Sequence, residues 1–267
     1  MDNIMARIKS DYEYVQNLGH TVLGVFLQGS QNYNLAYEGS DIDTKCIILP
    51  SFEDFCLNKK PVSTTLVLPS NEHIDLKDIR LMFECFKKQN VNFIEILFTK
   101  YRLINPAYEK YYQPMLDQAE TIARYNNFAF VNCMAGMALE KYKALEHPYP
   151  TLVDKIEKFG YDPKQLHHII RVYEFLARYI DGESYAECLI SKQPEYLIDV
   201  KRGCHSLEEA RKIARETTSA AVDMKNKYTN SHKVIVNYYV ENLMNNVLVD
   251  VLRASFINEI NKGDITQ

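Results

Sequence analysis

Two short motifs near the start of the chain carry residue types that bind phosphate and divalent metal. Gly29 and Ser30 follow an apolar run at residues 22–27, and Asp41 and Asp43 precede a second apolar run. Short apolar runs bounded by turn residues are typical of buried strands. Side chains two positions apart in a strand point to the same face, so we expect the two carboxylates to lie together. Adjacent carboxylates repel unless a cation neutralises them, and Mg2+, or Mn2+ in its place, is the expected ion because it prefers oxygen ligands.

The Gly-Ser pair supplies groups that suit a phosphate. Gly29 has no Cβ, so a ligand can approach its backbone closely. Ser30 offers a hydroxyl and an N–H, and residues 31–35 are expected to form a short helix whose N-terminus favours anions. Phosphate donors beside a metal-binding carboxylate pair suit phosphoryl or nucleotidyl transfer. The alternative is an ordinary turn followed by an exposed acidic turn, because short motifs often match by accident.

A third carboxylate, Asp75, lies in residues 72–76, where polar and apolar residues alternate before a helical run at 77–88. If this segment is a strand beside that of Asp41 and Asp43, Asp75 projects toward the same face. Three carboxylates would be enough to hold two metal ions. The alternative is that Asp75 lies near the start of the helix and is favoured there by the helix dipole.

A basic stripe is expected on a helix that begins at Asp162 and Pro163, which suit the N-cap and the first helical position. Lys164, His168 and Arg171 recur along one side of this helix, while its core face is expected to be apolar. Phe175 and Tyr179 fall on or near the same stripe, which favours a wall facing a cleft. The alternative is a solvated surface helix with scattered charges.

The spacing of Gly29-Ser30 and Asp41-x-Asp43 resembles the nucleotidyltransferase superfamily of DNA polymerase β. A closer resemblance, to a predicted nucleotidyltransferase family associated with RNA repair (the RNA-ligase-associated polymerase type), rests on three blocks. They contain Tyr33, Leu35, Ala36 and Ser40; the segment Gly160 to Arg171; and the segment Lys201 to Ala210. Three separated blocks are hard to obtain by chance.

Three residues depart from the family pattern. Gln31 stands where the family commonly has arginine, which removes one triphosphate contact, and Gln165 replaces the histidine expected after the lysine. Asn34 stands where glycine is common, which is a mild change because asparagine tolerates positive φ.

The resemblance implies an α+β fold: a small mixed-sheet nucleotidyltransferase core at residues 1–124, then a helical domain at 125–267 that closes the nucleotide cleft. It implies that Asp75 belongs to a strand, completes the metal site with Asp41 and Asp43, and helps to deprotonate the attacking hydroxyl. Gly29 and Ser30 would hold the phosphates of an NTP, and the basic stripe of Lys164, His168 and Arg171 would bind the triphosphate or the phosphates of the acceptor.

Composition limits the class of protein. The chain has 267 residues, of which 46% are hydrophobic and 25% charged, as in ordinary globular proteins. No apolar run reaches the length of a membrane span, and the polar N-terminus does not resemble a signal peptide. The six cysteines show no metal-binding spacing and are expected to be free thiols in a reducing cytoplasm. A net charge of −4 disfavours broad, non-specific duplex binding.

Three functional interpretations follow. The first is an active, metal-dependent nucleotidyltransferase, whose acceptor would be an RNA end, a protein side chain or a small molecule. The second is a nucleotide-binding regulatory protein with the same fold and little chemistry. The third is a helical interaction protein whose acidic pair is incidental. The three aspartates favour the first interpretation over the second, and the Gly-Ser pair argues against the third.

Overall fold

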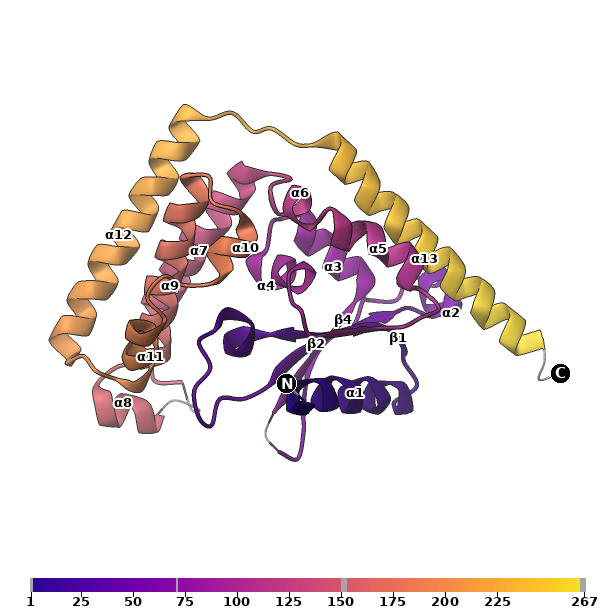
Figure 1. Ribbon diagram of the computed structural model, residues 1–267, viewed down its shortest axis with the longest axis horizontal. Helices are drawn as coiled ribbons and strands as arrows, with labels where there is room; N and C mark the ends of the chain where they lie inside the picture. The colour runs from indigo at the N-terminus through magenta and orange to yellow at the C-terminus, as the bar shows by residue number, and fades with distance from the viewer. Residues whose placement is uncertain (1, 71, 150–152, 265–267) are drawn as a thin grey trace. The chain divides into compact units, whose positions relative to one another are not determined.

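The computed structural model describes residues 2–70, 72–149 and 153–264, which divide into two units (Figure 1). The sheet unit comprises the described parts of residues 1–32, 39–125 and 236–267, and the helical unit comprises those of 33–38 and 126–235. The main change of unit lies beside the predicted boundary at residues 124 and 125. The C-terminal helix, however, belongs to the sheet unit rather than to the predicted helical domain.

A mixed five-stranded sheet is the centre of the sheet unit, which agrees with the expected α+β fold. Its strands are β1 (Thr21–Gln28), β2 (Asp43–Leu49), β3 (Ser63–Val67), β4 (His73–Asp78) and β5 (Arg102–Ile104). They lie in the order β3-β4-β2-β1-β5, and only β2 and β4 are parallel neighbours. The apolar runs and the alternating segment before residue 77 are therefore strands, as the sequence predicted.

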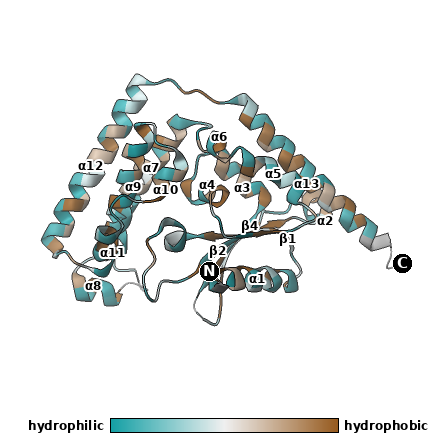
Figure 2. Ribbon diagram, in the orientation of Figure 1, coloured by the Kyte–Doolittle hydropathy of each residue, from teal (hydrophilic) through white to brown (hydrophobic). Residues whose placement is uncertain are grey.

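One face of the sheet packs against α1 (Asp2–Asn17), which lies on the opposite side from α3 and α5 in Figure 1. Ile8 and Val15 of α1 are fully buried against apolar residues of the strands, such as Val25 and Ile74. Figure 2 shows hydrophobic residues along the strands. The helical periodicity of the first residues therefore corresponds to a real buried stripe.

A polar network also links α1 to the sheet. Arg7 donates from Nε to Asp11 Oδ1 at 2.7 Å, and Thr44 Oγ1 donates to Asp11 Oδ2 at 2.6 Å. Arg7 also pairs with Glu72, the residue before β4. Burial raises the pKa of Asp11, an effect that the hydrogen bonds from Arg7 and Thr44 partly offset.

The other helices of the sheet unit are α2 (Phe52–Cys56), α3 (Ile79–Lys87), α4 (Val91–Ile94), α5 (Glu109–Asp117), α6 (Ala119–Ala123) and α13 (Tyr238–Asp264), with the short 3-10 turn η2 (Glu95–Leu97). Helix α3 contacts β2 and β4, and α13 lies along α3 and α5 (Figure 1). Phe256 of α13 packs against the rings of Phe52 and Phe55 in α2. The last helix in the sequence therefore packs in the same unit as the first strands.

The helical unit consists of α7 (Asn127–Ala144), α8 (Val153–Phe159), α9 (Pro163–Ile180), α10 (Tyr185–Leu189), α11 (Pro194–Arg202) and α12 (Leu207–Ser231). The predicted start of α9 is confirmed, because Asp162 caps this helix by accepting from Lys164 N at 3.0 Å. At α12, Ser206 and Glu209 form a capping box.

Helix α9 is buried on more than one side because α7, α10, α11 and α12 all pack against it. Phe130 of α7 stacks on Tyr179 with ring centroids 4.0 Å apart, and Phe175 contacts Tyr185 edge-on. The prediction that Phe175 and Tyr179 line a cleft is therefore wrong, since both side chains are buried in the aromatic core of the helical unit.

Across the described ranges of the chain, no helix combines the length and the apolar character needed to cross a membrane.

His167 is a buried histidine in α9 whose Nδ1 lies 2.8 Å from the carbonyl oxygen of Leu197. Burial lowers its pKa to about 4, despite the hydrogen bond to Leu197, which acts in the opposite direction. An unfolded histidine binds its proton near pH 6.5. Between the two pKa values of His167, the unfolded chain binds more protons than the folded chain. The stability of the fold that depends on a neutral His167 is therefore fully present above about pH 6.5 and is lost as the pH falls toward 4.

We predict that acidification from pH 7 to pH 5 lowers the free energy of unfolding by about 2 kcal/mol through His167 alone. Urea titrations of the wild type and of His167→Gln at both pH values would measure this contribution, since glutamine keeps a donor but does not titrate. His147→Gln, at an exposed histidine of the same unit, is the control and should keep the full pH dependence. An equal pH dependence in all three proteins would contradict the prediction.

Candidate functional site

The Gly-Ser turn and Asp43 lie side by side in the sheet unit. Strands β1 and β2 are antiparallel, and the last residue of β1, Gln28, pairs with Asp43. Gly29 has a φ of +77°, and a Cβ placed on it would lie 3.5 Å from Asp43 Oδ2. The turn and the carboxylate thus lie next to each other, and the backbone of Gly29 has a left-handed conformation that most other residues adopt only with strain.

The turn after β1 differs slightly from the expected helix at residues 31–35. A 3-10 turn, η1, covers Gly29–Tyr33 and begins at the glycine itself. Asn34 follows with a φ of 61°, which agrees with the expectation that asparagine substitutes for glycine there. Gln31 donates from Nε2 to the carbonyl oxygen of Ser40 at 3.4 Å and so links the turn to the acidic motif.

Asp41 and Asp43 do not share a strand, contrary to the prediction. Strand β2 begins at Asp43, and Asp41 is an exposed residue of the irregular segment before it. Alternation along a strand therefore does not place Asp41 beside Asp43. Between them, Ile42 N donates to Glu72 Oε1 at 3.4 Å, and its side chain is buried in the core. These contacts anchor the acidic motif to the sheet.

Asp75 lies on the predicted strand and on the predicted face. It is opposite Lys45 in the parallel pairing of β4 with β2, and Lys45 is two positions beyond Asp43, so all three side chains share one face. The alternative, in which Asp75 serves the start of α3, is wrong. Asp78 caps that helix instead and accepts from Arg80 N at 2.8 Å.

Lys45 is the site residue that sequence reasoning missed. Its side chain is 2% exposed, and its ammonium pairs with Asp75 and lies 4.3 Å from the ring centroid of Phe93. Burial lowers the pKa of Lys45, while Asp75 acts to raise it. Lys77 binds the second oxygen of Asp75 at 2.9 Å. A lysine inside an apolar strand was the available signal, because lysine is almost never fully buried unless it is paired.

The three predicted metal ligands do not form one cluster. Within residues 2–70, 72–149 and 153–264, no group of three or more histidine, cysteine or acidic side chains has an arrangement that could hold a metal ion. His73 Nδ1 lies 3.8 Å from Asp43 Oδ1, and Asp75 is engaged by lysines. A site formed by two carboxylates together with substrate phosphates still suits Mg2+, which keeps several waters and seldom uses an all-protein cage.

The predicted basic stripe lies in the helical unit. Lys164 is exposed, and the guanidinium of Arg171 stacks 3.9 Å above the ring of Tyr33. Burial, followed by the charge of Arg171, lowers the pKa of His168 well below its usual range, so this side chain is neutral near pH 7. The assignment of these three residues to a phosphate stays a prediction.

Tyr37 repeats the arrangement of Tyr33. Its ring lies 4.9 Å from Lys201 Nζ and 4.9 Å from the guanidinium carbon of Arg202. The segment from Tyr33 to Glu38 therefore belongs to the helical unit through cation–π contacts, although it stands between the Gly-Ser and acidic motifs in the chain.

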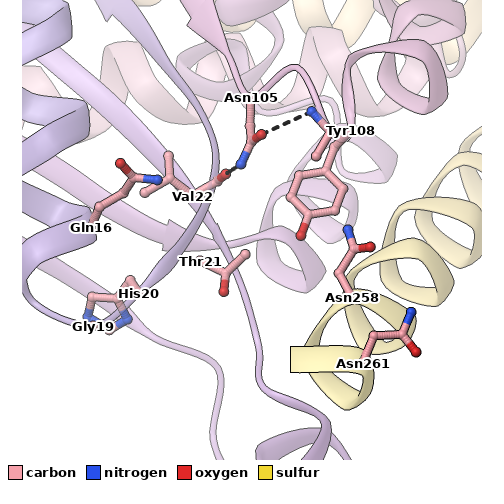
Figure 3. A pocket seen from close by; sticks show the side chains of 10 residues that line it. Gln16, Gly19, His20, Thr21, Val22, Asn105, Tyr108, Asn258 and Asn261 are labelled. Carbon is pink, nitrogen blue, oxygen red and sulfur yellow. Dashed lines mark hydrogen bonds between the residues drawn. The ribbon is translucent and has the colours of Figure 1, made fainter. Parts of the chain in front are cut away.

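A cavity of about 620 Å³ lies at the other end of β1, beside Thr21 and Val22 (Figure 3). Its wall includes His20, Tyr108 and Asn258, and none of the predicted site residues lines it. This cavity therefore does not coincide with the Gly-Ser and acidic motifs.

No protein-family model matches the chain, and a search of curated proteins finds no match.

We predict that Gly29→Ala weakens NTP binding by at least about tenfold, because its Cβ enters the space between the turn and Asp43. Gly19→Ala is the matched control: its φ is +88°, but no atom lies within 4 Å of the added Cβ. Both variants place alanine in the left-handed region, at a cost of about 1–3 kcal/mol. Equal losses of NTP affinity in the two variants, measured by calorimetry, would contradict the assignment of Gly29 to phosphate binding.

Proposed function

We propose that the protein is a metal-dependent nucleotidyltransferase that moves an NMP from an NTP to a hydroxyl acceptor. The observation that carries the proposal is the approach of Gly29 to Asp43, because it brings a turn suited to phosphate next to a carboxylate suited to Mg2+. The resemblance to polymerase β-like nucleotidyltransferases, and to those associated with RNA repair, supports the same reaction. The α+β fold is compatible with it.

The proposed roles follow from the chemistry of each group. The backbone of Gly29 and the hydroxyl and N–H of Ser30 hold phosphate oxygens of the donor. Asp41 and Asp43 hold Mg2+ or Mn2+, which supplies charge neutralisation and orientation for the triphosphate. The acceptor oxygen bonds to the α-phosphorus while the bond from that phosphorus to the bridging oxygen breaks, so pyrophosphate leaves and the hydroxyl proton passes to solvent.

The identity of the acceptor is a separate part of the proposal. An RNA end is our first choice because of the RNA-repair resemblance, and a protein side chain or a small molecule is the alternative. The free cysteines agree with a reducing compartment, and we propose that the protein is located in the cytoplasm.

A second candidate is a nucleotide-binding regulatory protein with little transfer activity. The observation that favours it is the pairing of both oxygens of Asp75 with Lys45 and Lys77, which leaves Asp75 poorly suited to accept a proton from an acceptor hydroxyl.

The direct test incubates the pure protein with each α-labelled NTP, Mg2+ or Mn2+, and a panel of RNA and protein acceptors. Transfer of label to one acceptor class would support the enzyme. Tight NTP binding without transfer to any acceptor would favour the regulatory protein instead.

We predict that Asp43→Asn lowers the transfer rate by at least about 100-fold, because a metal-bound carboxylate contributes several kcal/mol to stabilising the transition state. Asp41→Asn should act in the same direction. Asp117→Asn, at an exposed aspartate of α5, is the control and should transfer at the wild-type rate. If Asp43→Asn turned over as fast as this control, Asp43 would not be a metal ligand.

A further inference from the structure

The ammonium of Lys45 occupies a position on the sheet where a second cation would otherwise be expected. Along β2 it follows Asp43 on the same face, and across the sheet it is opposite Asp75. Directly opposed side chains in neighbouring strands are closer than diagonal ones. Asp43 and Asp75 are diagonal neighbours, and Lys45 lies directly opposite Asp75 and two positions from Asp43 on the same face.

Lys45 is held in this position by more than one contact. Its ammonium binds Asp75 Oδ2 and lies over the ring of Phe93, and its side chain is 2% exposed. If the Lys45 ammonium separated from Asp75, either an unpaired charge would remain in a buried position or the lysine side chain would have to leave the core. Lys45 is therefore a fixed positive charge rather than a mobile surface lysine.

Asp75 has no oxygen without a positive partner. Oδ2 accepts from Lys45, and Oδ1 lies 2.9 Å from Lys77 Nζ. Two-metal sites hold their ions about 3.5–4 Å apart and need carboxylates that reach both. A second divalent ion at Asp75 would face two ammonium groups, one of them buried, and the like charges would repel it.

We propose that Lys45 takes the place of the second metal ion, so that the site binds a single divalent ion through Asp41, Asp43 and the donor phosphates. Asp75 then holds the lysine in place instead of binding metal. Lys45 is a positioning residue: its ammonium supplies positive charge on the face of the sheet that carries Asp43. The inference rests on the proposed nucleotidyltransferase function and replaces the three-carboxylate metal site that the sequence suggested.

The test counts Mn2+ bound to the wild-type protein in the presence of α,β-methylene NTP analogues, which are not cleaved between the α- and β-phosphates. We expect about one Mn2+ per chain and an uncoupled electron paramagnetic resonance spectrum, since coupling requires two ions about 4 Å apart. Two ions with a coupled spectrum would overturn the inference while leaving the proposed function intact. No bound ion, together with no nucleotidyl transfer, would overturn the proposed function and this inference with it.

Variants then test the role of the lysine itself. In Lys45→Met, which keeps the length of the side chain but removes the charge, we expect a second Mn2+ to bind and the metal dependence of transfer to steepen from first toward second order. Lys77→Met is the matched control, because it removes the more exposed partner of the same carboxylate, and it should stay at about one ion. An unchanged ion count in a folded Lys45→Met protein would overturn the inference. If Lys45→Met does not fold, the number of bound Mn2+ is compared between the wild type and Lys45→Arg, which keeps the charge. Two ions per chain in either protein would overturn the inference, and one ion per chain in both would support it.

Discussion

The antiparallel pairing of β1 with β2 is the constraint on which the candidate site depends. It brings Gln28 opposite Asp43 and so places the turn that leaves one strand beside the carboxylate that begins the next. Because side chains alternate along a strand, a shift of one residue would turn Asp43 and Lys45 toward α1 and Thr44 away from it. The approach of Gly29 to Asp43 and the pairing of Lys45 with Asp75 would then disappear together. The chemistry proposed for the site therefore depends on the register of the sheet as well as on the individual residues.

Strand β2 carries a polar interaction on each face, and each one fixes that register. Toward α1, Thr44 binds Asp11, which binds Arg7; on the opposite face, Lys45 binds Asp75. Buried ion pairs add little net stability compared with apolar packing, but removing one partner is costly. Here the two interactions favour one register of β2 over others, because a register shifted by one residue would bring Thr44 and Lys45 to the wrong faces. The apolar residues of β2, among them Cys46 and Ile48, gain most from being buried in the same arrangement.

The sequence predicted the elements whose periodicity is strong and missed what depends on spatial neighbours. Alternation together with the family resemblance predicts that Asp75 lies on a strand, and Asp162 with Pro163 predicts the start of α9; the structure confirms both. Backbone pairing of β2 begins at Asp43, so alternation along that strand does not extend to Asp41. Phe175 lies on a stripe expected to face a cleft, but several helices cover α9 and bury this side chain. Lys45 gave no signal of its partner, since cross-strand neighbours are set by register and not by sequence distance.

The sheet unit is discontinuous in the chain, and this has a consequence for the order of folding. Helix α13 packs on α3 and α5, and Phe256 contacts Phe52, but the whole of residues 126–235 is synthesised between them. Domains made of one continuous stretch can fold as they leave the ribosome. Here α13 can pack on the rest of its unit only after residues 126–235 have been synthesised, and the ring of Tyr33 meets Arg171 only after that residue has been made. Until then the hydrophobic surface that α13 covers on α2, α3 and α5 is exposed, and exposed hydrophobic surface makes a partly synthesised chain prone to aggregate.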